Sequence, residues 1–220
     1  MNSVPETAEL IGENLACRRG ERVVFRGVDF RLPPGGALML RGPNGSGKSS
    51  LLRLLATLLV PAAGRLVCDG VPVSNDPARY RALIHYVGHL DAVKAALTPR
   101  QMLGFWAALR GAQRPAIEAA LAAFGIERAA DWPCRWLSAG QRRRLALARL
   151  IAAPAPIWLL DEPGAALDRD GMTQLDAAIA AHRALGGSIA LATHEAAPIA
   201  NAATLQLDAF AAAPQDLLSV

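Results

Sequence analysis

The chain has 220 residues, a length typical of one large domain or two small lobes. With 52% hydrophobic and 19% charged residues it can bury a substantial core, which excludes an intrinsically disordered protein. Its net charge of +4 is too small to indicate by itself a nucleic-acid or anionic membrane partner.

The cysteines and the apolar segments bear on where the protein works. Cys17, Cys68 and Cys134 are scattered and form no C-x-x-C motif, which indicates small buried thiols in a reducing compartment and no metal or covalently attached haem. The first nine residues carry acids and no apolar segment, so we expect no secretory signal. Because no apolar run reaches about 18 residues, we expect a soluble protein that can dock onto a membrane protein. We predict that residues 1–220 form a single domain.

The predicted elements begin with weak alternation over residues 9–32, which indicates short, twisted antiparallel strands. A buried strand over 37–40 precedes a helix over 50–59, and a strand pair turns at Asp69 and Gly70. The later elements are a helical turn over 76–82, a strand over 83–87, helices from about 97 to 136, a helix over 142–150, and strands over 157–160 and 188–191. Because the apolar strands follow helical segments, we expect right-handed crossovers into a parallel sheet.

Three local features refine the helical regions. Thr98 as N-cap and Pro99 at the first helical position predict where a helix starts. Two alanine-rich tracts, 107–130 and 177–213, are predicted to be packed helices. The basic run 142–144 is interpreted as a solvated helix face.

Residues 42–49 match the phosphate-binding pattern G-x-x-x-x-G-K-[ST]. Its glycines let the backbone turn and bring N–H groups close to a phosphate, Lys48 supplies positive charge, and the Ser49 hydroxyl is a ligand for Mg²⁺. A strand before the loop and a helix after it place the phosphates at a helix N-terminus. The predicted nucleotide-binding residues are Gly42, Pro43, Asn44, Gly45, Ser46, Gly47, Lys48, Ser49 and Ser50.

Two further segments supply groups for nucleotide chemistry. Asp161 and Glu162 end an apolar strand, where the aspartate can hold the same Mg²⁺ and the glutamate can polarise a water for attack on a γ-phosphate. The second segment precedes a helix and offers a hydroxyl and N–H groups to an anion, although an ordinary helix N-cap explains it better when it is taken alone. Its residues are Leu137, Ser138, Ala139, Gly140 and Gln141.

The order of these segments resembles that of the ATP-binding cassette (ABC) ATPases. The motifs of that family follow in a fixed order: a phosphate loop, an L-S-x-G-Q signature, a strand ending in D-E-P, a D-loop and a lone histidine. The D-loop corresponds here to 165–168 and the lone histidine to His194. The match runs from about residue 10 to residue 208. The resemblance implies an α/β fold: a P-loop NTPase cassette with a RecA-like core, an N-terminal antiparallel β subdomain, and an inserted α-helical subdomain at about 90–136 that docks onto a membrane partner.

The resemblance also implies ATP and Mg²⁺ as ligands and a second copy of the chain as a partner. Two cassettes of this family pack head to tail, so the signature of one copy, above all Ser138 and Gly140, faces the γ-phosphate of the ATP held by the other. Glu162 would be the catalytic base, and His194 would contact the γ-phosphate and sense hydrolysis. The metal ligands would be Ser49, Asp161 and, at the position where most members have Gln, His89.

Two departures from the common pattern narrow the family. His89 stands in the Q-loop, and no aromatic residue stands near Arg19, where most cassettes stack one on adenine; an Arg guanidinium could replace it through a cation–π contact. These features and the segment 51–56 resemble the ATP-binding subunits of bacterial cytochrome c maturation systems, often called haem exporters, although Leu90 stands where those usually have Gln. This implies a peripheral protein on the cytoplasmic face of the inner membrane, with integral membrane subunits of that system as partners. ATP hydrolysis would then support release of a haem-loaded chaperone.

Other functions stay open at this point. The runner-up is the ATP-binding subunit of another ABC exporter or importer of a small solute. The membrane partner recognises the transported substrate, so this sequence does not identify that substrate. Glu162 and His194 argue against a nucleotide-gated module without useful hydrolysis. The lack of a second cassette or a long coiled coil argues against an ABC ATPase that acts on ribosomes or DNA. We expect no nucleic-acid partner and no direct haem binding, because His85, His89 and His182 have ordinary explanations.

Overall fold

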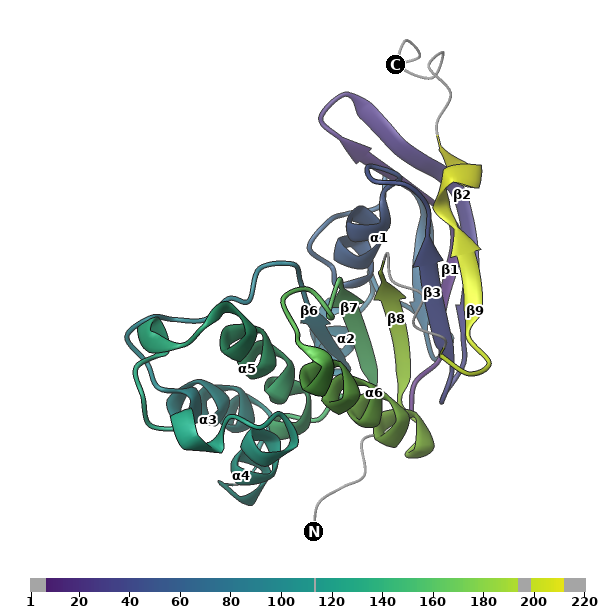
Figure 1. Ribbon diagram of the computed structural model, residues 1–220. Helices are drawn as coiled ribbons and strands as arrows, with labels where there is room; N and C mark the ends of the chain where they lie inside the picture. Colours follow the sequence, from purple (N-terminus) through teal and green to yellow (C-terminus); the bar gives the residue numbers. More distant parts are fainter. Residues whose placement is uncertain (1–6, 113, 194–198, 212–220) are drawn as a thin grey trace.

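The computed structural model describes residues 7–112, 114–193 and 199–211, and these contain two sheets and a group of helices (Figure 1). The antiparallel sheet has the strand order β2-β1-β4-β5, and the second sheet has the order β6-β7-β8-β3-β9. The strands are β1 (Leu10–Arg19), β2 (Arg22–Leu32), β3 (Ala37–Arg41), β4 (Ala63–Cys68), β5 (Val71–Pro72), β6 (Ile84–Val87), β7 (Ile157–Asp161), β8 (Ser188–Ala192) and β9 (Ala203–Gln206). The helices are α1 (Lys48–Leu55), α2 (Pro77–Ala82), α3 (Pro99–Leu109), α4 (Arg114–Ala123), α5 (Ala139–Ala152) and α6 (Arg169–Ala184), with 3₁₀ turns η1 (Glu127–Ala129), η2 (Cys134–Trp136) and η3 (Leu207–Phe210).

The antiparallel sheet forms as predicted but from longer strands. β1 and β2 run for 10 and 11 residues, with register shifts in their pairing, whereas the weak alternation predicted short strands. These irregularities interrupt the period of two, which explains why the alternation looks weak in the sequence. β4 and β5 pair around Asp69 and Gly70, which both have positive φ values of 49° and 75°, so the predicted hairpin is confirmed.

The second sheet is parallel throughout, which confirms the predicted α/β fold. β7 pairs with β6 and β8, and β3 pairs with β8 and β9, all in the parallel sense. β9 was not predicted, because residues 203–206 lie in an alanine-rich tract that was expected to be helical. Only one of its four residues is buried, so it lacks the apolar signal of the central strands.

Alternate residues of the central strand β7 face two hydrophobic clusters, one on each side of the sheet. Ile157 and Leu159 pack in the cluster that contains the leucines of α1 and the inner face of the antiparallel sheet. Trp158 and Leu160 pack in the cluster that contains α6 and continues into α3, α4 and α5. The parallel sheet is therefore covered on both faces, which holds the carboxyl ends of its strands in a fixed arrangement.

Helix α1 spans residues 48–55, four residues short of the predicted end at 59. Thr57 has a left-handed φ of 58°, which breaks the helix, and Leu58 and Val60 are 61% and 88% exposed. The leucine pattern therefore overstated the helix, since it continues through Leu58 and Leu59 beyond the point where the backbone leaves the helical conformation.

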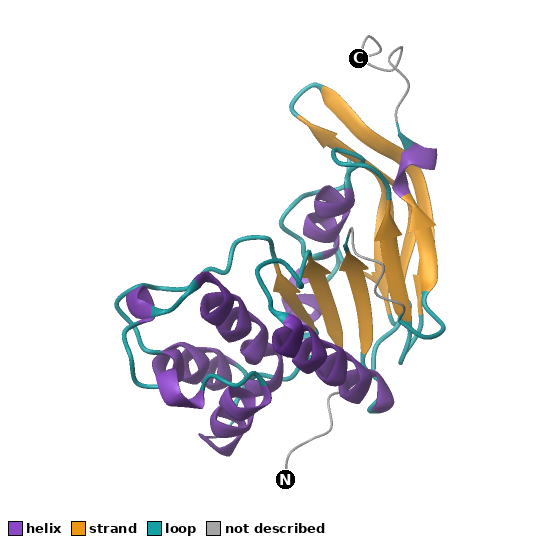
Figure 2. Cartoon of the chain, in the orientation of Figure 1, coloured by secondary structure: helices purple, strands orange, loops and turns teal. Residues whose placement is uncertain are grey.

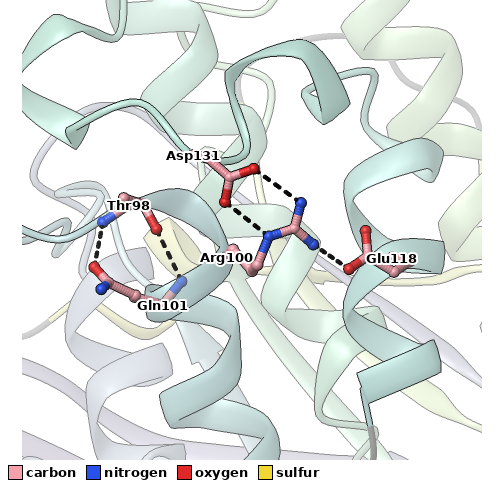
Figure 3. Close-up of polar contacts among 5 residues, drawn as sticks. All are labelled: Thr98, Arg100, Gln101, Glu118 and Asp131. Atoms are coloured by element: carbon pink, nitrogen blue, oxygen red, sulfur yellow. Dashed lines mark hydrogen bonds and ion pairs between the residues drawn. The ribbon is translucent and has the colours of Figure 1, made fainter.

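Helices α3, α4 and α5 lie together at one side of the parallel sheet, and α5 contacts β6 (Figures 1 and 2). Thr98 caps α3 as predicted: its hydroxyl accepts from the Gln101 N–H at 3.2 Å, and the Gln101 side chain accepts from the Thr98 N–H at 2.9 Å (Figure 3). Arg100 on the same turn donates from Nε to Asp131 Oδ1 at 2.9 Å and also bonds to Glu118 of α4 (Figure 3). The helical group thus has its own polar links between α3, α4 and the segment before α5.

No helix in the described part of the chain is both long enough and apolar enough to cross a membrane.

Candidate functional site

The phosphate loop lies between β3 and α1, and its glycines adopt backbone angles that other residues rarely take. Gly42, Gly45 and Gly47 have φ values of 137°, 84° and 104°. Gly47 is also the N-cap of α1, and a Cβ on it would lie 2.7 Å from Val24 Cγ1 and 2.9 Å from Phe25 Cδ1. The predicted reason for glycine in this loop, tight turning and close approach of the backbone, agrees with these angles.

Lys48 lies across the loop that precedes it. Its ammonium donates to the carbonyl oxygens of Gly42 at 2.7 Å and Pro43 at 3.1 Å, and the side chain is buried. A lysine ammonium has three donors, so one N–H remains for a further acceptor in the loop. This places a positive charge where the loop N–H groups and the N-terminus of α1 also favour an anion.

Ser49 and Asp161 meet at the start of α1 and the end of β7. The Ser49 hydroxyl donates to Asp161 Oδ1 at 3.0 Å, and Asp161 is almost fully buried. Asp161 Oδ2 is also buried and accepts no hydrogen bond from the residues that the structure describes. Two hard oxygens with an unsatisfied carboxylate oxygen fit Mg²⁺, which is usually held by one or two carboxylates together with phosphates and water. Residues 7–112, 114–193 and 199–211 contain no cluster of three or more His, Cys, Asp or Glu side chains that would hold a metal alone.

A pocket of about 620 Å³ opens beside the loop and brings together residues from distant parts of the sequence. Its lining residues are Arg19, Arg22, Val24, Asn44, Gly45, Gly47, Lys48, Ser49, Ser50, His89 and Glu162. Glu162 and His89 therefore lie at the phosphate loop, as the sequence predicted for a base and a Q-loop residue. His194, predicted to contact the γ-phosphate, lies outside the described residues.

The pocket has no aromatic lining among the described residues. Arg19, Arg22 and Val24 line it, whereas Phe25 is fully buried beneath the loop. The sequence predicted that the usual aromatic platform for adenine is missing here, and the lining agrees. The guanidinium groups of Arg19 and Arg22 line the pocket, and a contact of one of them with adenine stays a prediction.

The signature residues form the N-terminus of α5 and do not line this pocket. Ser138 is the N-cap, accepting from the Gln141 N–H at 3.1 Å, and the Gln141 side chain accepts from the Ser138 N–H at 2.9 Å. The ordinary N-cap explanation is thus correct as far as one chain shows. A Cβ on Gly140 would lie 3.1 Å from the carbonyl oxygen of Ala166, so the signature packs closely against the D-loop. Within one chain, the signature is therefore not part of the pocket at the phosphate loop.

The D-loop is tied to the signature helix through its last residue. Asp168 caps α6 by accepting from the Gly171 N–H at 2.9 Å, and it also pairs with Arg144 of α5. These two interactions lower the pKa of the Asp168 carboxyl, with the bond from the Gly171 N–H as the larger cause.

Arg143 contradicts the interpretation of residues 142–144 as a solvated helix face. It is 1% exposed and lies among the strand ends next to the pocket. A run of three arginines carries no signal for which one points inward, because this depends on how α5 packs against β6 and β7. The buried position of this residue was therefore missed from the sequence.

The remaining histidines and cysteines have structural explanations. His85 and His182 are buried, and their Nε2 atoms bond to the carbonyl oxygens of Ala153 and, at 3.3 Å, Ser188. Burial is the main cause that lowers their pKa values, to about 3 and about 4. The three cysteines are buried free thiols, as predicted.

Comparison with known proteins agrees with this geometry. A family model described as "ABC transporter" matches residues 25–165, which include the phosphate loop, the signature and Asp161–Glu162. The chain belongs to the ABC transporter family.

Similar curated proteins carry one name, "Cytochrome c biogenesis ATP-binding export protein CcmA". The protein of Rhodospirillum rubrum is 56% identical over 92% of this chain and 87% of its own length, and that of Paramagnetospirillum magneticum is 52% identical over 92% and 95%. The protein of Pseudomonas putida is 46% identical over 86% of this chain and 90% of its own length. The resemblance to ATP-binding subunits of cytochrome c maturation systems is confirmed.

Solved structures share the fold at low sequence identity. The dimer of an ATP-binding cassette in a post-hydrolysis state, bound to ADP and Pi, matches with a TM-score of 0.76 and 24% identity over 84% of this chain and 88% of that one. Part of an ABC transporter complex from Clostridium perfringens matches with a TM-score of 0.71 and 27% identity over 86% and 80%.

Proposed function

We propose that the protein is the ATP-hydrolysing subunit of a membrane ABC complex of cytochrome c maturation. The observation that carries this proposal is the pocket that joins the phosphate loop to Glu162 and His89, next to the Ser49–Asp161 pair. It occurs in a chain that is 56% identical to a relative named for ATP-binding export in cytochrome c biogenesis. ATP is the substrate and Mg²⁺ the cofactor that this donor set fits.

The residues of the pocket divide the chemistry between them. The loop N–H groups and Lys48 bind the β- and γ-phosphates, and Ser49 and Asp161 hold Mg²⁺, which neutralises charge on the phosphates when it is bound. Glu162 polarises the attacking water, and its carboxylate at the pocket wall suits it to accept a proton from that water. His194 is proposed to contact the γ-phosphate.

A second copy of the chain completes the site. The signature residues Ser138 and Gly140 offer a helix N-terminus to an anion, yet they do not line the pocket of their own chain. A head-to-tail dimer brings them to the γ-phosphate of the partner's ATP. One structural relative was solved as a dimer bound to ADP and Pi, which supports a dimer of this chain.

The helical group is the proposed contact with integral membrane subunits, on the cytoplasmic face of the inner membrane. Large apolar side chains are exposed on α3 and in the segment before it, among them Leu90, Phe105 and Leu109, which are 83%, 57% and 63% exposed. Apolar groups of this size are common at protein contacts. The domain limits of 1–220, with an inserted subdomain at about 90–136, are part of the same proposal.

ATP hydrolysis in this complex supports haem handling and release of the haem-loaded chaperone, without haem binding to this subunit. The described histidines support this division, since His85 and His182 are buried against backbone carbonyls and His89 lines the nucleotide pocket. The alternative is the ATP-binding subunit of another exporter or importer of a small solute, for which the pocket would be the same.

The ATPase rate of the wild type and of Glu162→Gln tests the enzymatic part of the proposal. We expect the variant to bind ATP but to lose at least about a hundredfold in rate, because an amide cannot accept the proton of the attacking water. Equal rates in the two proteins would remove Glu162 as the base.

Purification of the tagged chain from membranes tests the assignment to a system: integral subunits of cytochrome c maturation support it, and subunits of a solute transporter would favour the alternative.

A further inference from the structure

Arg143 is a buried arginine on α5, two residues after the signature, and every donor of its guanidinium is used. Nε donates to the carbonyl oxygen of Pro163 at 3.0 Å. Nη1 donates to the carbonyl oxygen of Gly88 at 2.9 Å and to Asp91 Oδ1 at 3.2 Å. Nη2 donates to the carbonyl oxygens of Asp161 at 3.1 Å and Glu162 at 2.6 Å. A guanidinium has five N–H donors, so all five have an acceptor.

The acceptors belong to two chain segments, each of which contributes a lining residue to the nucleotide pocket. Three of them belong to Asp161, the last residue of β7, and to Glu162 and Pro163 directly after it, and the other two flank His89 after β6. Four of the five acceptors are backbone carbonyls, so the contact fixes the path of the main chain and does not depend on which side chains it carries. One planar group therefore joins the end of β6, the end of β7 and the signature helix.

Glu162 needs such a support because its backbone is in an unfavourable conformation. Its φ is 48°, in the left-handed region that residues other than glycine rarely adopt. Its N–H donates to the carbonyl oxygen of Ala192 at 2.8 Å, and its own carbonyl accepts from Arg143. The peptide groups on both sides of Glu162 are thus held, and this sets the direction in which its carboxylate leaves the backbone.

We propose that Arg143 is a positioning residue for hydrolysis: it holds Glu162 at the pocket and links its placement to His89 and to the signature helix. The inference rests on the proposed ATPase function and on Glu162 as its base. Arg143 does not line the pocket, so it acts on the reaction through Glu162 and not by contact with ATP.

Arg143→Lys tests this inference, with Arg149→Lys as the matched control. Lysine keeps the charge but offers three donors in place of five, and it cannot reach both strand ends at once. Arg149 is the second buried arginine of α5; it bonds to the carbonyl oxygen of Tyr86 and lies 5.0 Å over the Trp106 ring, not against Glu162. The same substitution at the same kind of site thus controls for lost stability.

We expect Arg143→Lys to lower kcat by about ten- to a hundredfold while the dissociation constant for ATP changes less than about threefold. Arg149→Lys should keep kcat within about threefold of the wild type. An unchanged kcat in Arg143→Lys, or a parallel loss of ATP binding, would overturn the inference. If circular dichroism shows that Arg143→Lys is unfolded, Arg143→Met, which buries no charge, carries the same prediction and the same refutation.

A double variant shows whether the effect passes through Glu162. In the Glu162→Gln background, single-turnover hydrolysis should change less than about threefold when Arg143→Lys is added, because the group that Arg143 positions is already gone. A further tenfold loss in that background would contradict positioning through Glu162. A wild type that does not hydrolyse ATP would instead overturn the proposed function, so the two failures are distinguishable.

Discussion

Single residues decide the shape of the phosphate loop, and their requirements follow from backbone geometry. Gly45 and Gly47 both have positive φ, yet a Cβ on Gly45 would meet no atom within 4 Å, whereas one on Gly47 would press on Val24 and Phe25. Phe25 is fully buried and cannot easily move. The two glycines therefore separate the effect of backbone strain from the effect of crowding.

We predict that Gly47→Ala destabilises the protein more than Gly45→Ala. Alanine at either position adds about 1–2 kcal/mol of left-handed backbone strain, and at Gly47 overpacking adds about 1–3 kcal/mol more. Urea unfolding of both variants measures the difference in the free energy of unfolding. Equal destabilisation would show that the contacts at Gly47 relax without cost.

Among single residues, those within short motifs were placed correctly from the sequence, whereas Arg143 was not. Lys48, Ser49 and Asp161 lie where the motifs predicted, because each motif is a short segment whose local geometry is set by its own residues. Arg143 was misinterpreted because its environment comes from two strand ends, more than 15 residues away in either direction, that only the folded sheet brings together.

At the scale of elements, the parallel sheet was predicted from its apolar strands, and the errors occur where an element lacks a strong apolar pattern. β9 was not predicted because three of its four residues are exposed. The predicted end of α1 was too late because Leu58 and Leu59 continue the leucine pattern beyond Leu55, where the helix ends. Helix α6 packs on the sheet partly through His182, whose ring stacks on Trp158 of β7 at 3.8 Å between centroids.

Because His85 and His182 are buried, we predict that the free energy of unfolding falls in mild acid. His85 and His182 have folded-state pKa values of about 3 and about 4, below the usual 6.5, so the unfolded chain binds more protons between these values and pH 6.5. Stability is therefore fully present above about pH 6.5 and falls as the pH is lowered, by about 2 kcal/mol for each histidine between pH 7 and pH 5.

Denaturant unfolding of the wild type and His182→Gln at pH 7 and pH 5 measures this contribution. Glutamine cannot titrate but can still donate to the carbonyl oxygen of Ser188. The variant should lose about 2 kcal/mol less than the wild type on going from pH 7 to pH 5. An identical loss in both proteins would mean that His182 does not contribute.

At the scale of the whole molecule, we propose that each chain carries two halves of a site, because the signature does not line the pocket at the phosphate loop. The pocket holds the phosphate loop, Glu162 and His89, and the N-terminus of α5 presents Ser138 and Gly140 elsewhere. Within a chain, Arg143 connects the signature helix to the pocket residue Glu162, and the pair of Arg144 and Asp168 connects that helix to the D-loop. The sequence could suggest this division only through a family resemblance, because no local pattern tells whether two loops act in one chain or in two.

Mixing two inactive variants tests most directly whether the site is shared between two copies. Lys48→Ala disables the phosphate loop and leaves the signature intact, whereas Gly140→Asp places a negative charge in the signature opposite the partner's γ-phosphate and leaves the phosphate loop intact. We predict that each variant alone is inactive and that an equimolar mixture recovers about a quarter of the wild-type ATPase rate, since half of the dimers are mixed and each of these has one intact site. No recovery in the mixture, with both variants folded and able to dimerise, would contradict a site built from two copies.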